Sequence, residues 1–438
     1  MKIIFGKTDT LDYLKKIRIN NYLDIKTNGN GYFEKEYNHI DYAKKIIQKT
    51  KSEGDKFLFD LSSKLDGEKF GKVEVSKNEL SKSIDLISKD ERKIIEDTIS
   101  RIEEFQKNTL YKNWFDEKLG YGEYVRPINS IGCYIPSGSA PLISTILMTV
   151  VPAKVAGVKK IIVSSPTKGS NLPNKFLLAS AYLSGVDKFY TYGGPQAISS
   201  MAYGTENVDK VDMICGPGNI FVMSTKKLVY GDVGLDGIFG PTETLIIADS
   251  SSNKDYVTGD LMAQAEHDKL ALPMMITKDV KFAEEINNLY KIKMKTLSRK
   301  NIIEESMNNG FISVIDSNEE IIEVSNQIAS EHISIASESL IHLSESITSA
   351  GSIFLGEISS EVLADYVAGP SHVMPTNGSA KYSSSVSSRT FLKSIPVLSI
   401  NKKRFLEISE DAEKLASLES LDAHQEALSI RREKFSME

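Results

Sequence analysis

Six histidines are the scarcest side chains in this chain that could bind a metal or move a proton. One of them, His267, lies in the run Gln264-Ala265-Glu266-His267-Asp268, which ends an amphipathic stretch that starts at Tyr256. The offset of three residues puts Gln264 and His267 on one helix face, where an amide oxygen and an imidazole nitrogen could bind the same ion. Taken alone, the pattern also fits an ordinary helix end, because histidine there complements the helix dipole.

Two later segments contain further ligand types. Asp365 and His372 flank a Gly-Pro break, and His424 follows Asp422 at the expected start of the last helix. One amide oxygen, one carboxylate and two imidazoles would form a four-ligand N/O site suited to Zn²⁺. Sequence separation alone does not show that these segments converge.

The dipeptide Glu331-His332 carries a different kind of chemistry. Adjacent Glu and His at the edge of a helix could supply two bases of different pKa to one substrate carbon, which suits a reaction with two proton removals. The alternative is a solvated loop. His39 and His342 lie in helical stretches without a partner pattern, and we expect them to be surface or packing residues.

These side chains must be positioned by an α/β fold. Short β-branched runs bounded by Gly or Pro alternate with helix-length segments, which predicts parallel sheets covered on both faces. A second alternation begins after Pro241, so two similar α/β units are expected. Residues 34–108 read as long surface helices, and the chain from about residue 390 reads as mainly helical, with helices at 404–415 and 422–432. The predicted strands are 131–135, 160–164, 188–192, 211–215, 243–248, 272–277, 311–315 and 352–355.

Glycine-rich loops follow three strands of the first alternation. They are Gly216-Pro217-Gly218-Asn219, Gly193-Gly194-Pro195-Gln196 and Pro136-Ser137-Gly138-Ser139. The first lacks the third glycine of an ordinary dinucleotide motif, and each loop alone fits a tight strand-to-helix turn. Together they would line one edge of one sheet, which predicts a mononucleotide or dinucleotide crevice.

Composition limits the class of protein. The 438 residues exceed one ordinary core, and the balance of 41% hydrophobic and 26% charged residues is that of a globular protein. The net charge of −6 without a sustained basic block argues against a nucleic-acid partner. Two cysteines without a CxxC pattern support neither a disulfide framework nor a thiolate zinc site and favour a reducing compartment.

Targeting and membrane signals are weak in this sequence. The N-terminal residues show no secretory signal, and Pro152 and Lys154 interrupt the longest apolar stretch, residues 142–158. We therefore expect a cytoplasmic protein without a membrane partner.

Several of these segments together resemble the histidinol dehydrogenase family. They occur in that family's order and extend from about residue 30 to the C-terminus. They are Cys133 to Leu142, Gly216 to Asn219, Gly240 to Glu243, Gln264 to His267, Ser330 to His332 and Gly369 to Ser385.

The resemblance implies a fold of two incomplete Rossmann-like units with parallel sheets, plus small N- and C-terminal segments. Residues 1–29 would form an N-terminal segment. Residues 30–132 with 242–386 would form a discontinuous domain with the metal and substrate site, and residues 133–241 the NAD-binding domain. Residues 387–438 would complete the site of a partner subunit in a homodimer.

The resemblance also implies an activity: NAD-dependent oxidation of L-histidinol to L-histidine in two hydride transfers, through an aldehyde that stays bound. Glu331 and His332 would be catalytic, with His332 taking the hydroxyl proton and Glu331 activating water. The implied zinc ligands are Gln264, His267, Asp365 and His424. The implied NAD contacts are Tyr134, Gln196 and Asn219, and the implied substrate contacts are Thr242, His372 and Glu419 together with His332 and the four zinc ligands.

Two departures from the family pattern are visible. Thr242 stands where the family usually has Ser, so the hydroxyl remains but a methyl group is added. Asp236-Gly237-Ile238-Phe239 replaces a more Ala-rich run. Two other classes fit parts of the pattern: a zinc hydrolase in which Glu331 activates metal-bound water, and a non-catalytic nucleotide-binding or assembly protein.

Overall fold

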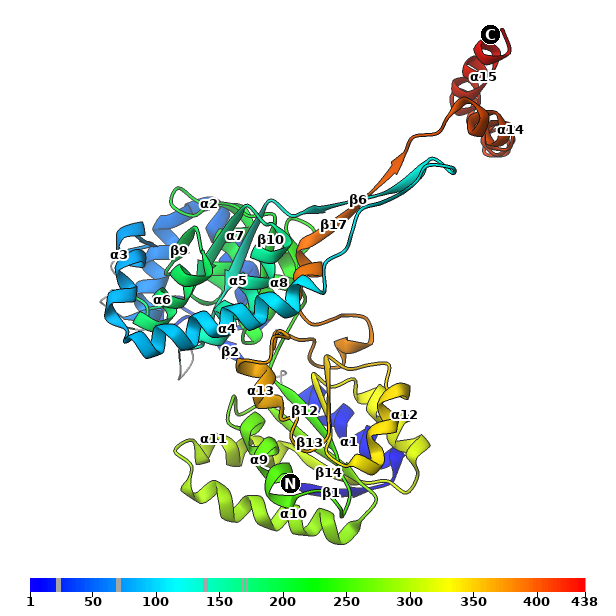
Figure 1. Cartoon of the computed structure of the whole chain (residues 1–438). Coiled ribbons are helices and arrows are strands. Elements are labelled where there is room, and N and C mark those ends of the chain that lie inside the picture. The colour runs from blue at the N-terminus through cyan, green and yellow to red at the C-terminus, as the bar shows by residue number, and fades with distance from the viewer. Residues whose placement is uncertain (21–24, 68–71, 137–140, 168, 171, 438) are drawn as a thin grey trace. The chain divides into compact units, whose positions relative to one another are not determined.

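The computed structural model describes residues 1–20, 25–67, 72–136, 141–167, 169–170 and 172–437. They form two compact units, residues 1–109 with 128–391 and residues 110–127 with 392–438. Figure 1 shows the elements coloured along the chain. Ser137 and the two residues after it, which the sequence placed in a nucleotide loop, lie outside the described residues.

The larger unit contains a sheet of six parallel strands in the order β1-β14-β13-β12-β15-β16. Its strands are β1 (Lys2–Phe5), β12 (Glu243–Ile247), β13 (Leu272–Thr277), β14 (Phe311–Val314), β15 (His332–Ile335) and β16 (Ser352–Leu355). Its helices are α1 (Lys7–Asn20), α9 (Lys254–Ala265), α10 (Val280–Lys293), α11 (Lys300–Asn309), α12 (Asn318–Ile328) and α13 (Glu361–Tyr366), with the 3₁₀ segments η2 (Met294–Thr296) and η3 (Glu338–Ser346).

Strand β12 shows why both faces of this sheet are covered. Leu245 and Ile247 pack on one face with residues of α1 and α12, whereas Ile246 packs on the other with residues of α9, α10 and α11. Alternate residues of a strand point to opposite faces, so a run that is apolar throughout needs helices on both sides. Since β1 and α1 belong to this sheet, we propose to include residues 1–20 in its domain and not in a separate terminal segment.

The same unit contains a second sheet in the order β11-β10-β7-β8-β9-β4, parallel except for β4 at one edge. Its strands are β4 (Glu74–Val75), β7 (Ser130–Tyr134), β8 (Lys160–Ser164), β9 (Lys188–Tyr190), β10 (Met213–Cys215) and β11 (Gly234–Leu235). Its helices are α2 (His39–Asp66), α3 (Lys77–Lys82), α4 (Lys89–Lys107), α5 (Ile143–Ala156), α6 (Lys175–Ser184), α7 (Gly194–Tyr203) and α8 (Ile220–Val229), with η1 (Ser83–Leu86).

Residues 39–107 pack on this second sheet, although the sequence analysis grouped them with the metal-site domain. Tyr42, Phe57 and Leu61 of α2 share a core with residues of β7, β9 and α7. Ile95 and Ile102 of α4 pack against α5. These apolar contacts stabilise the helices where they are, and we propose the domain boundary accordingly. The short pair β2 (Lys26–Thr27) and β3 (Tyr37–Asn38) precedes α2.

The smaller unit is a long antiparallel ribbon followed by two helices. Strand β6 (Tyr121–Pro127) pairs over its whole length with β17 (Leu392–Leu398), and β5 (Trp114–Asp116) pairs with the other edge of β6. Helices α14 (Lys402–Leu418) and α15 (Asp422–Met437) pack on each other. The rings of Phe405 and Phe435 meet edge to face there, with their centroids 5.5 Å apart.

The α/β fold class and the eight predicted strands are confirmed, with shifts of up to two residues at their ends. The chain after residue 390 is mainly helical, as expected, in the two helices at 402–418 and 422–437, although strand β17 precedes them. One expectation was wrong: Glu331-His332 lies not at the edge of a helix but at the start of the buried strand β15, which we did not predict. Cys133 and Cys215 are free and buried, and their sulfur atoms lie 3.3 Å apart on neighbouring strands. No described helix is both long and apolar enough to cross a membrane.

Candidate active site

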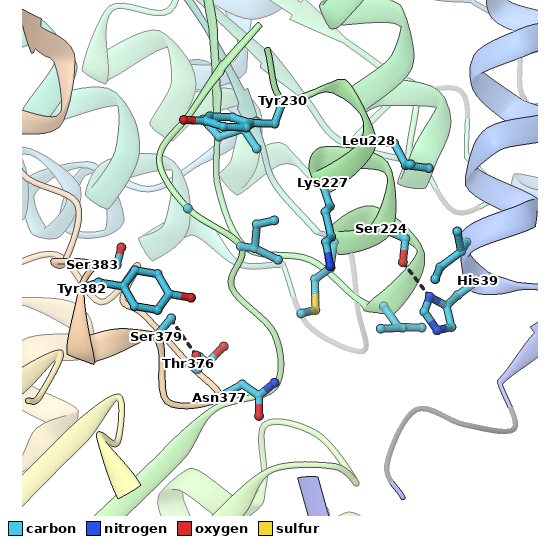
Figure 2. A pocket seen from close by; sticks show the side chains of 16 residues that line it. His39, Ser224, Lys227, Leu228, Tyr230, Thr376, Asn377, Ser379, Tyr382 and Ser383 are labelled. Carbon is cyan, nitrogen blue, oxygen red and sulfur yellow. Dashed lines mark hydrogen bonds between the residues drawn. The ribbon is translucent and has the colours of Figure 1, made fainter. Parts of the chain in front are cut away.

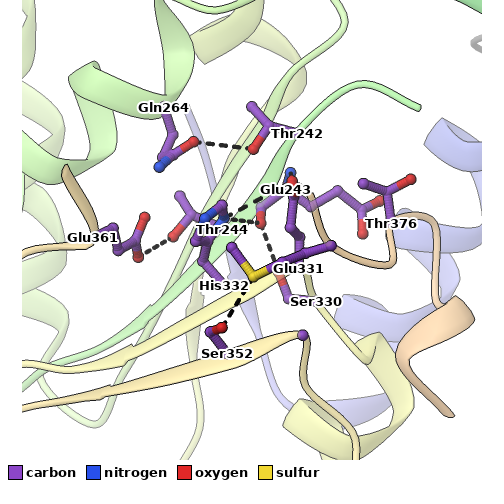
Figure 3. Close-up of polar contacts among 12 residues, drawn as sticks. Thr242, Glu243, Thr244, Gln264, Ser330, Glu331, His332, Ser352, Glu361 and Thr376 are labelled. Carbon is purple, nitrogen blue, oxygen red and sulfur yellow. Dashed lines mark hydrogen bonds and ion pairs between the residues drawn. The ribbon is translucent and has the colours of Figure 1, made fainter. Parts of the chain in front are cut away.

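The candidate active site lies at the N-terminal ends of β12 and β15, which pair in parallel with Thr244 opposite His332. This register brings the loop Thr242-Glu243 beside Ser330-Glu331, as Figure 3 shows. Ligands of open α/β sheets are usually found at the carboxyl ends of the strands. This sheet instead carries its reactive side chains at the opposite, amino ends of these two strands.

Glu331 and His332 are both buried, with 6% and 2% of their surface exposed. One carboxylate oxygen of Glu331 accepts a hydrogen bond from the Glu243 backbone N–H at 3.1 Å. The same oxygen lies 3.8 Å from Nδ1 of His332, and Nε2 of His332 lies 3.7 Å from the carboxylate of Asp365. The imidazole thus stands between two carboxylates, where a proton can be taken up or released.

Burial and charge shift the protonation of this group. Burial raises the pKa of Glu331 to about 7, although His332 and the Thr242 hydroxyl oppose the shift. For His332, burial alone lowers the pKa, but the carboxylates of Asp365, Glu331 and Glu361 outweigh it and raise the pKa to about 10. A glutamate that titrates near neutral pH is suited to general acid-base catalysis.

Gln264, Asp365 and His267 come together from the last turns of two helices. The side-chain nitrogen of Gln264 lies 3.5 Å from a carboxylate oxygen of Asp365, and its oxygen accepts from the Thr242 hydroxyl at 3.0 Å. His267 follows the end of α9 beside them. Burial lowers its pKa, while Asp365 acts in the opposite direction.

An amide oxygen, a carboxylate and an imidazole are suitable donors for Zn²⁺, so the residues present fit that metal. Rotation of the Gln264 amide by half a turn would present its oxygen to Asp365 and its neighbours. In the described part of the chain no three His, Cys, Asp or Glu side chains form a complete cluster.

His372 contacts Asp365, and Glu361 contacts Thr244, which is paired with His332. The ring of His372 contacts the backbone oxygen of Asp365 at 2.8 Å through Nδ1 and the Thr145 hydroxyl at 3.2 Å through Nε2. Burial raises the pKa of Glu361 to about 7, and one of its oxygens accepts from the Thr244 hydroxyl. Its other oxygen and Nε2 of His332 are buried without a hydrogen-bond partner among the described residues, which is costly unless a ligand binds there.

The predicted nucleotide residues lie at the carboxyl ends of the second sheet. Tyr134 ends β7, and its buried hydroxyl accepts from the Gly194 N–H at 3.1 Å, across the intervening strand β8. Gln196 stands in the first turn of α7, where its side-chain oxygen is buried and finds no partner in the described ranges. The unpaired oxygen of Gln196 could accept from a hydroxyl group of a dinucleotide. The N-terminus of α7, which follows a glycine turn, could bind its phosphate groups.

The loop that precedes α8 is held in an unusual way. Gly216 has φ of +111°, and a Cβ atom there would lie 2.2 Å from the backbone oxygen of Tyr134, so only glycine fits. Its N–H donates to the carboxylate of Asp236 at 2.7 Å, and its C=O accepts from the ammonium group of Lys226 at 2.9 Å. Lys226 and Asp236 also pair directly at 2.6 Å, with 1% and 0% of their side chains exposed.

Asn219 caps the helix at the end of this loop. Its side-chain oxygen accepts from the N–H groups of Phe221 and Val222 at 3.1 and 3.2 Å. The amide nitrogen of the exposed Asn219 side chain is then the part that can donate to a ligand. The buried pair Lys226–Asp236 thus fixes a loop that ends on a predicted NAD contact.

A pocket of about 840 Å³ lies beside α8. Figure 2 shows Lys227 extending from this helix toward the loop with Asn377 and Tyr382, while His39 contacts Ser224 at 2.7 Å. The lining does not include Glu331 or His332. The pocket therefore belongs to the surface next to the nucleotide loop and not to the acid-base pair.

Glu419 and His424 lie in the smaller unit. Glu419 follows the last residue of α14, and His424 stands in the first turn of α15; both side chains are exposed. The remaining predicted residues belong to the larger unit, and Thr242, Gln264, Glu331, His332, Asp365 and His372 are linked there through the contacts given above.

Sequence reasoning missed Glu243, Glu361 and the pair Lys226–Asp236. Glu361 could have been found from its spacing of four residues to Asp365, which puts both carboxylates on one helix face. Asp236 was noticed only as a departure from the family pattern. Nothing in the sequence indicated that Glu243 would bind Glu331 and contact His332 through its backbone.

Glycine loops at the carboxyl edge of a Rossmann-like sheet, together with a buried acid-base pair and N/O metal donors, define a nicotinamide-dependent dehydrogenase with a metal site. The comparisons with known proteins agree with this class. The chain belongs to the histidinol dehydrogenase family, whose model matches residues 33–432.

Similar proteins support this membership over nearly the whole chain. The histidinol dehydrogenase of Clostridium acetobutylicum is 39% identical and the alignment covers 90% of this chain and 92% of that protein. That of Oceanobacillus iheyensis is 40% identical, with 89% and 92% covered. The crystal structure of histidinol dehydrogenase from Elizabethkingia anophelis superposes with a TM-score of 0.90 at 33% identity, covering 100% of this chain and 99% of that one.

Membership determines the activity class. The chain is a zinc-dependent, NAD-dependent dehydrogenase of histidine biosynthesis, and its small-molecule substrate is histidinol. The hydrolase and the non-catalytic protein considered as alternatives do not agree with this membership.

Proposed function

We propose that one site, built around Glu331 and His332, carries out both oxidations from L-histidinol to L-histidine and retains the aldehyde between them. The observation that supports this proposal is the buried acid-base pair beside Gln264 and Asp365. A buried site excludes solvent, and retention of a reactive aldehyde avoids its loss.

In its neutral form, His332 takes the proton from the substrate hydroxyl in the first oxidation; a bound divalent cation would favour this form by offsetting the carboxylate charges that raise the pKa of His332 to about 10. Glu331 then removes a proton from the water that adds to the aldehyde, and its pKa of about 7 suits that role near neutral pH. The N–H of Glu243 holds one oxygen of Glu331, so the carboxylate keeps a defined orientation through both steps.

We propose Gln264, His267, Asp365 and His424 as the zinc ligands. When bound, zinc would hold the amino and imidazole nitrogens of histidinol, and NAD⁺ would accept a hydride in each oxidation. The Thr242 hydroxyl contacts the Gln264 amide, and after the half-turn of that amide it would accept from the nitrogen and hold the oxygen toward the metal. His372 holds the backbone of Asp365, and we propose that it contacts substrate after releasing Thr145.

For the dinucleotide we propose Tyr134, Gln196 and Asn219 as contacts. The unpaired oxygen of Gln196 can accept from a ribose hydroxyl, and the free amide nitrogen of Asn219 can donate to an acceptor. The N-termini of α7 and α8 add positive dipole ends, which favour phosphate.

We further propose a homodimer in which Glu419 and His424 of one subunit complete the site of the other. Leu415, Leu418 and Ile430 of the helical pair α14–α15 are 62%, 83% and 56% exposed. Large apolar side chains grouped on a small unit indicate a surface that is covered by a partner. A cytoplasmic location is proposed because both cysteines are free, as in a reducing compartment.

The activity is tested by mixing the protein with L-histidinol and NAD⁺ and following the absorbance of NADH. We expect two NADH per histidine formed, without release of aldehyde to a trapping reagent. One NADH per histidinol consumed, with trapped aldehyde as the product, would show that the two oxidations are not joined at one site.

The shared site is tested by mixing subunits of two inactive variants, His332→Asn and His424→Ala. In a mixed dimer with sites completed in trans, one site receives both substitutions and the other receives none. Random mixing should then restore about a quarter of the activity of the unmodified protein. Activity that stays at the level of the separate variants would show that His424 acts within its own subunit.

A further inference from the structure

Helix α1 reaches the active site through Arg18. The guanidinium group binds both carboxylate oxygens of Glu243, at 3.1 Å from Nε and 2.7 Å from Nη2. Nη2 also donates to the backbone oxygen of Ile328, the last residue of α12, at 3.0 Å. Only 18% of the Arg18 side chain and 6% of the Glu243 side chain are exposed. A bidentate pair of this kind has a fixed geometry.

Glu243 in turn holds the catalytic residues through its backbone. Its N–H donates to Glu331 at 3.1 Å. Its C=O accepts from the Ser330 hydroxyl at 3.1 Å and lies 3.4 Å from Nδ1 of His332. The carboxylate of Glu243 also accepts the N–H of Asn377 at 3.1 Å. The peptide that orients the acid-base pair is thus tied to Arg18 by the side chain of the same residue.

The surroundings show that Glu243 depends on this arginine. Burial raises the pKa of Glu243, and Arg18 is the main group that opposes this shift. A Cβ atom at Gly378 would lie 2.9 Å from Nη1 of Arg18, so the glycine leaves room for the guanidinium group. Without Arg18, a buried carboxylate would lose its counter-charge, and the side chain and backbone of Glu243 would shift from their present positions.

We infer that Arg18 is a positioning residue of the oxidation: through Glu243 it fixes the carboxylate of Glu331 and the ring of His332 in the orientation that the reaction needs. This inference rests on the roles proposed for Glu331 and His332. Residue 18 lies outside the range 33–432 that matches the family and outside the segments that carry the resemblance. The contacts themselves assign the role.

The test compares Arg18→Ala with Lys16→Ala, which removes an exposed charge from the same helix. Displacement of catalytic groups by about 1 Å lowers turnover by up to about 100-fold, so kcat of Arg18→Ala should fall roughly 10- to 100-fold. The KM for histidinol and for NAD⁺ and the zinc content should stay close to those of Lys16→Ala. Guanidinium ion at a low, non-denaturing concentration should restore part of kcat in Arg18→Ala alone.

Arg18→Lys provides a second measure in case Arg18→Ala does not fold. Lysine keeps the charge but cannot bind both oxygens of Glu243, so its kcat should lie between those of Arg18→Ala and the unmodified protein. A kcat of Arg18→Lys equal to that of the unmodified protein would overturn the inference. So would a loss in Arg18→Ala that comes with lost zinc, raised KM for both substrates and no response to guanidinium, because that result describes a general structural role.

His332→Asn separates this inference from the proposed function. If His332→Asn keeps full turnover, the proposed acid-base roles are wrong, and the inference about Arg18 falls with them. If His332→Asn is impaired while Arg18→Ala equals Lys16→Ala, the acid-base roles stand and only the role of Arg18 is refuted.

Discussion

The buried pair Lys226–Asp236 offers the sharpest test of how the nucleotide loop is held. We consider Lys226→Met, which keeps the length of the side chain and removes its charge. The substitution breaks the contacts of the ammonium group with Asp236 at 2.6 Å and with the Gly216 oxygen at 2.9 Å, and leaves a carboxylate that is 0% exposed. Removal of one partner from a buried ion pair costs about 3–5 kcal/mol.

This cost can be read from thermal unfolding. For a domain of roughly 150–250 residues, each kcal/mol changes the melting temperature by about 2–4 °C, so Lys226→Met should melt roughly 6–20 °C lower than the unmodified protein. The matched control is Lys227→Met, the same change at the neighbouring, exposed position of α8. Surface substitutions stay within about 0.5 kcal/mol, so the control should melt within about 2 °C.

The loss of melting temperature in Lys226→Met should also depend on pH, and its direction follows from the pKa of Asp236. Burial raises the pKa of this carboxyl, and Lys226 opposes the shift. Without Lys226 the pKa rises further, and a group with a raised pKa in the folded protein destabilises it increasingly as pH rises through that value. The deficit of Lys226→Met should therefore be smaller at about pH 5.5 than at about pH 8.

A double variant distinguishes charge from packing. Lys226→Met with Asp236→Asn leaves no unpaired charge, while the amide oxygen can still accept from the Gly216 N–H, so part of the lost melting temperature should return. Lys226→Met and the double variant should both show a raised KM for NAD⁺, because the backbone oxygen of Gly216 has lost the ammonium group that donated to it. If Lys226→Met melts like Lys227→Met, or if its deficit is the same at both pH values, the pair does not hold the loop as described.

Three further predictions concern the active site. His332→Asn should lower turnover by roughly 10²- to 10⁴-fold while zinc content stays nearly intact, and unchanged turnover would remove His332 from its role as a base. His267→Ala and His424→Ala should each lose zinc in elemental analysis, and full occupancy in either variant would show that the ligand set is wrong. Thr242→Ser keeps the hydroxyl that binds Gln264 and should keep both zinc and turnover, whereas Thr242→Val should lower zinc affinity by roughly 10- to 100-fold; equal affinity in the two variants would contradict the orienting role of the hydroxyl.

The strands that could be predicted are those with a clear local pattern. Residues 272–277 and 311–315 are short apolar runs between polar segments, and both form buried strands. Strand β15 was missed because its four residues begin with His332, and a polar first residue hides the run. The ribbon of β6 and β17 was missed because its two strands pair across more than 250 residues of sequence, as Tyr121 does with Leu398, and such a pairing leaves no local pattern.

The residue types of the candidate site could be predicted, but their convergence could not. Gln264 and His267 share a helix face by spacing alone, which is local information. Their proximity to Asp365 depends on the order of strands in the sheet, and the contact between His332 and Asp365 depends on the pairing of β15 with β16 and on the position of α13 after β16. Neither is a property of neighbouring residues. The resemblance to a family supplied what spacing could not.

The proposed ligand sites of the two sheets lie at opposite strand ends, and helix dipoles give a physical reason. The nucleotide loops Gly193–Gln196 and Gly216–Asn219 lead into the N-termini of α7 and α8, where the positive dipole end favours the phosphates of a dinucleotide. The proposed metal ligands Gln264 and Asp365 stand in the last turns of α9 and α13, and His267 follows the end of α9.

Helix C-termini carry partial negative charge and favour a cation. An anionic cofactor is therefore favoured at helix N-termini, next to the carboxyl ends of the strands, and a metal ion at helix C-termini, next to the amino ends of the strands. A sheet that held both at its carboxyl edge would set the zinc ion against positive helix ends. The placement of Glu331 and His332 at the start of β15, against the usual preference for loops after strands, would then follow from the charge of the proposed metal beside them.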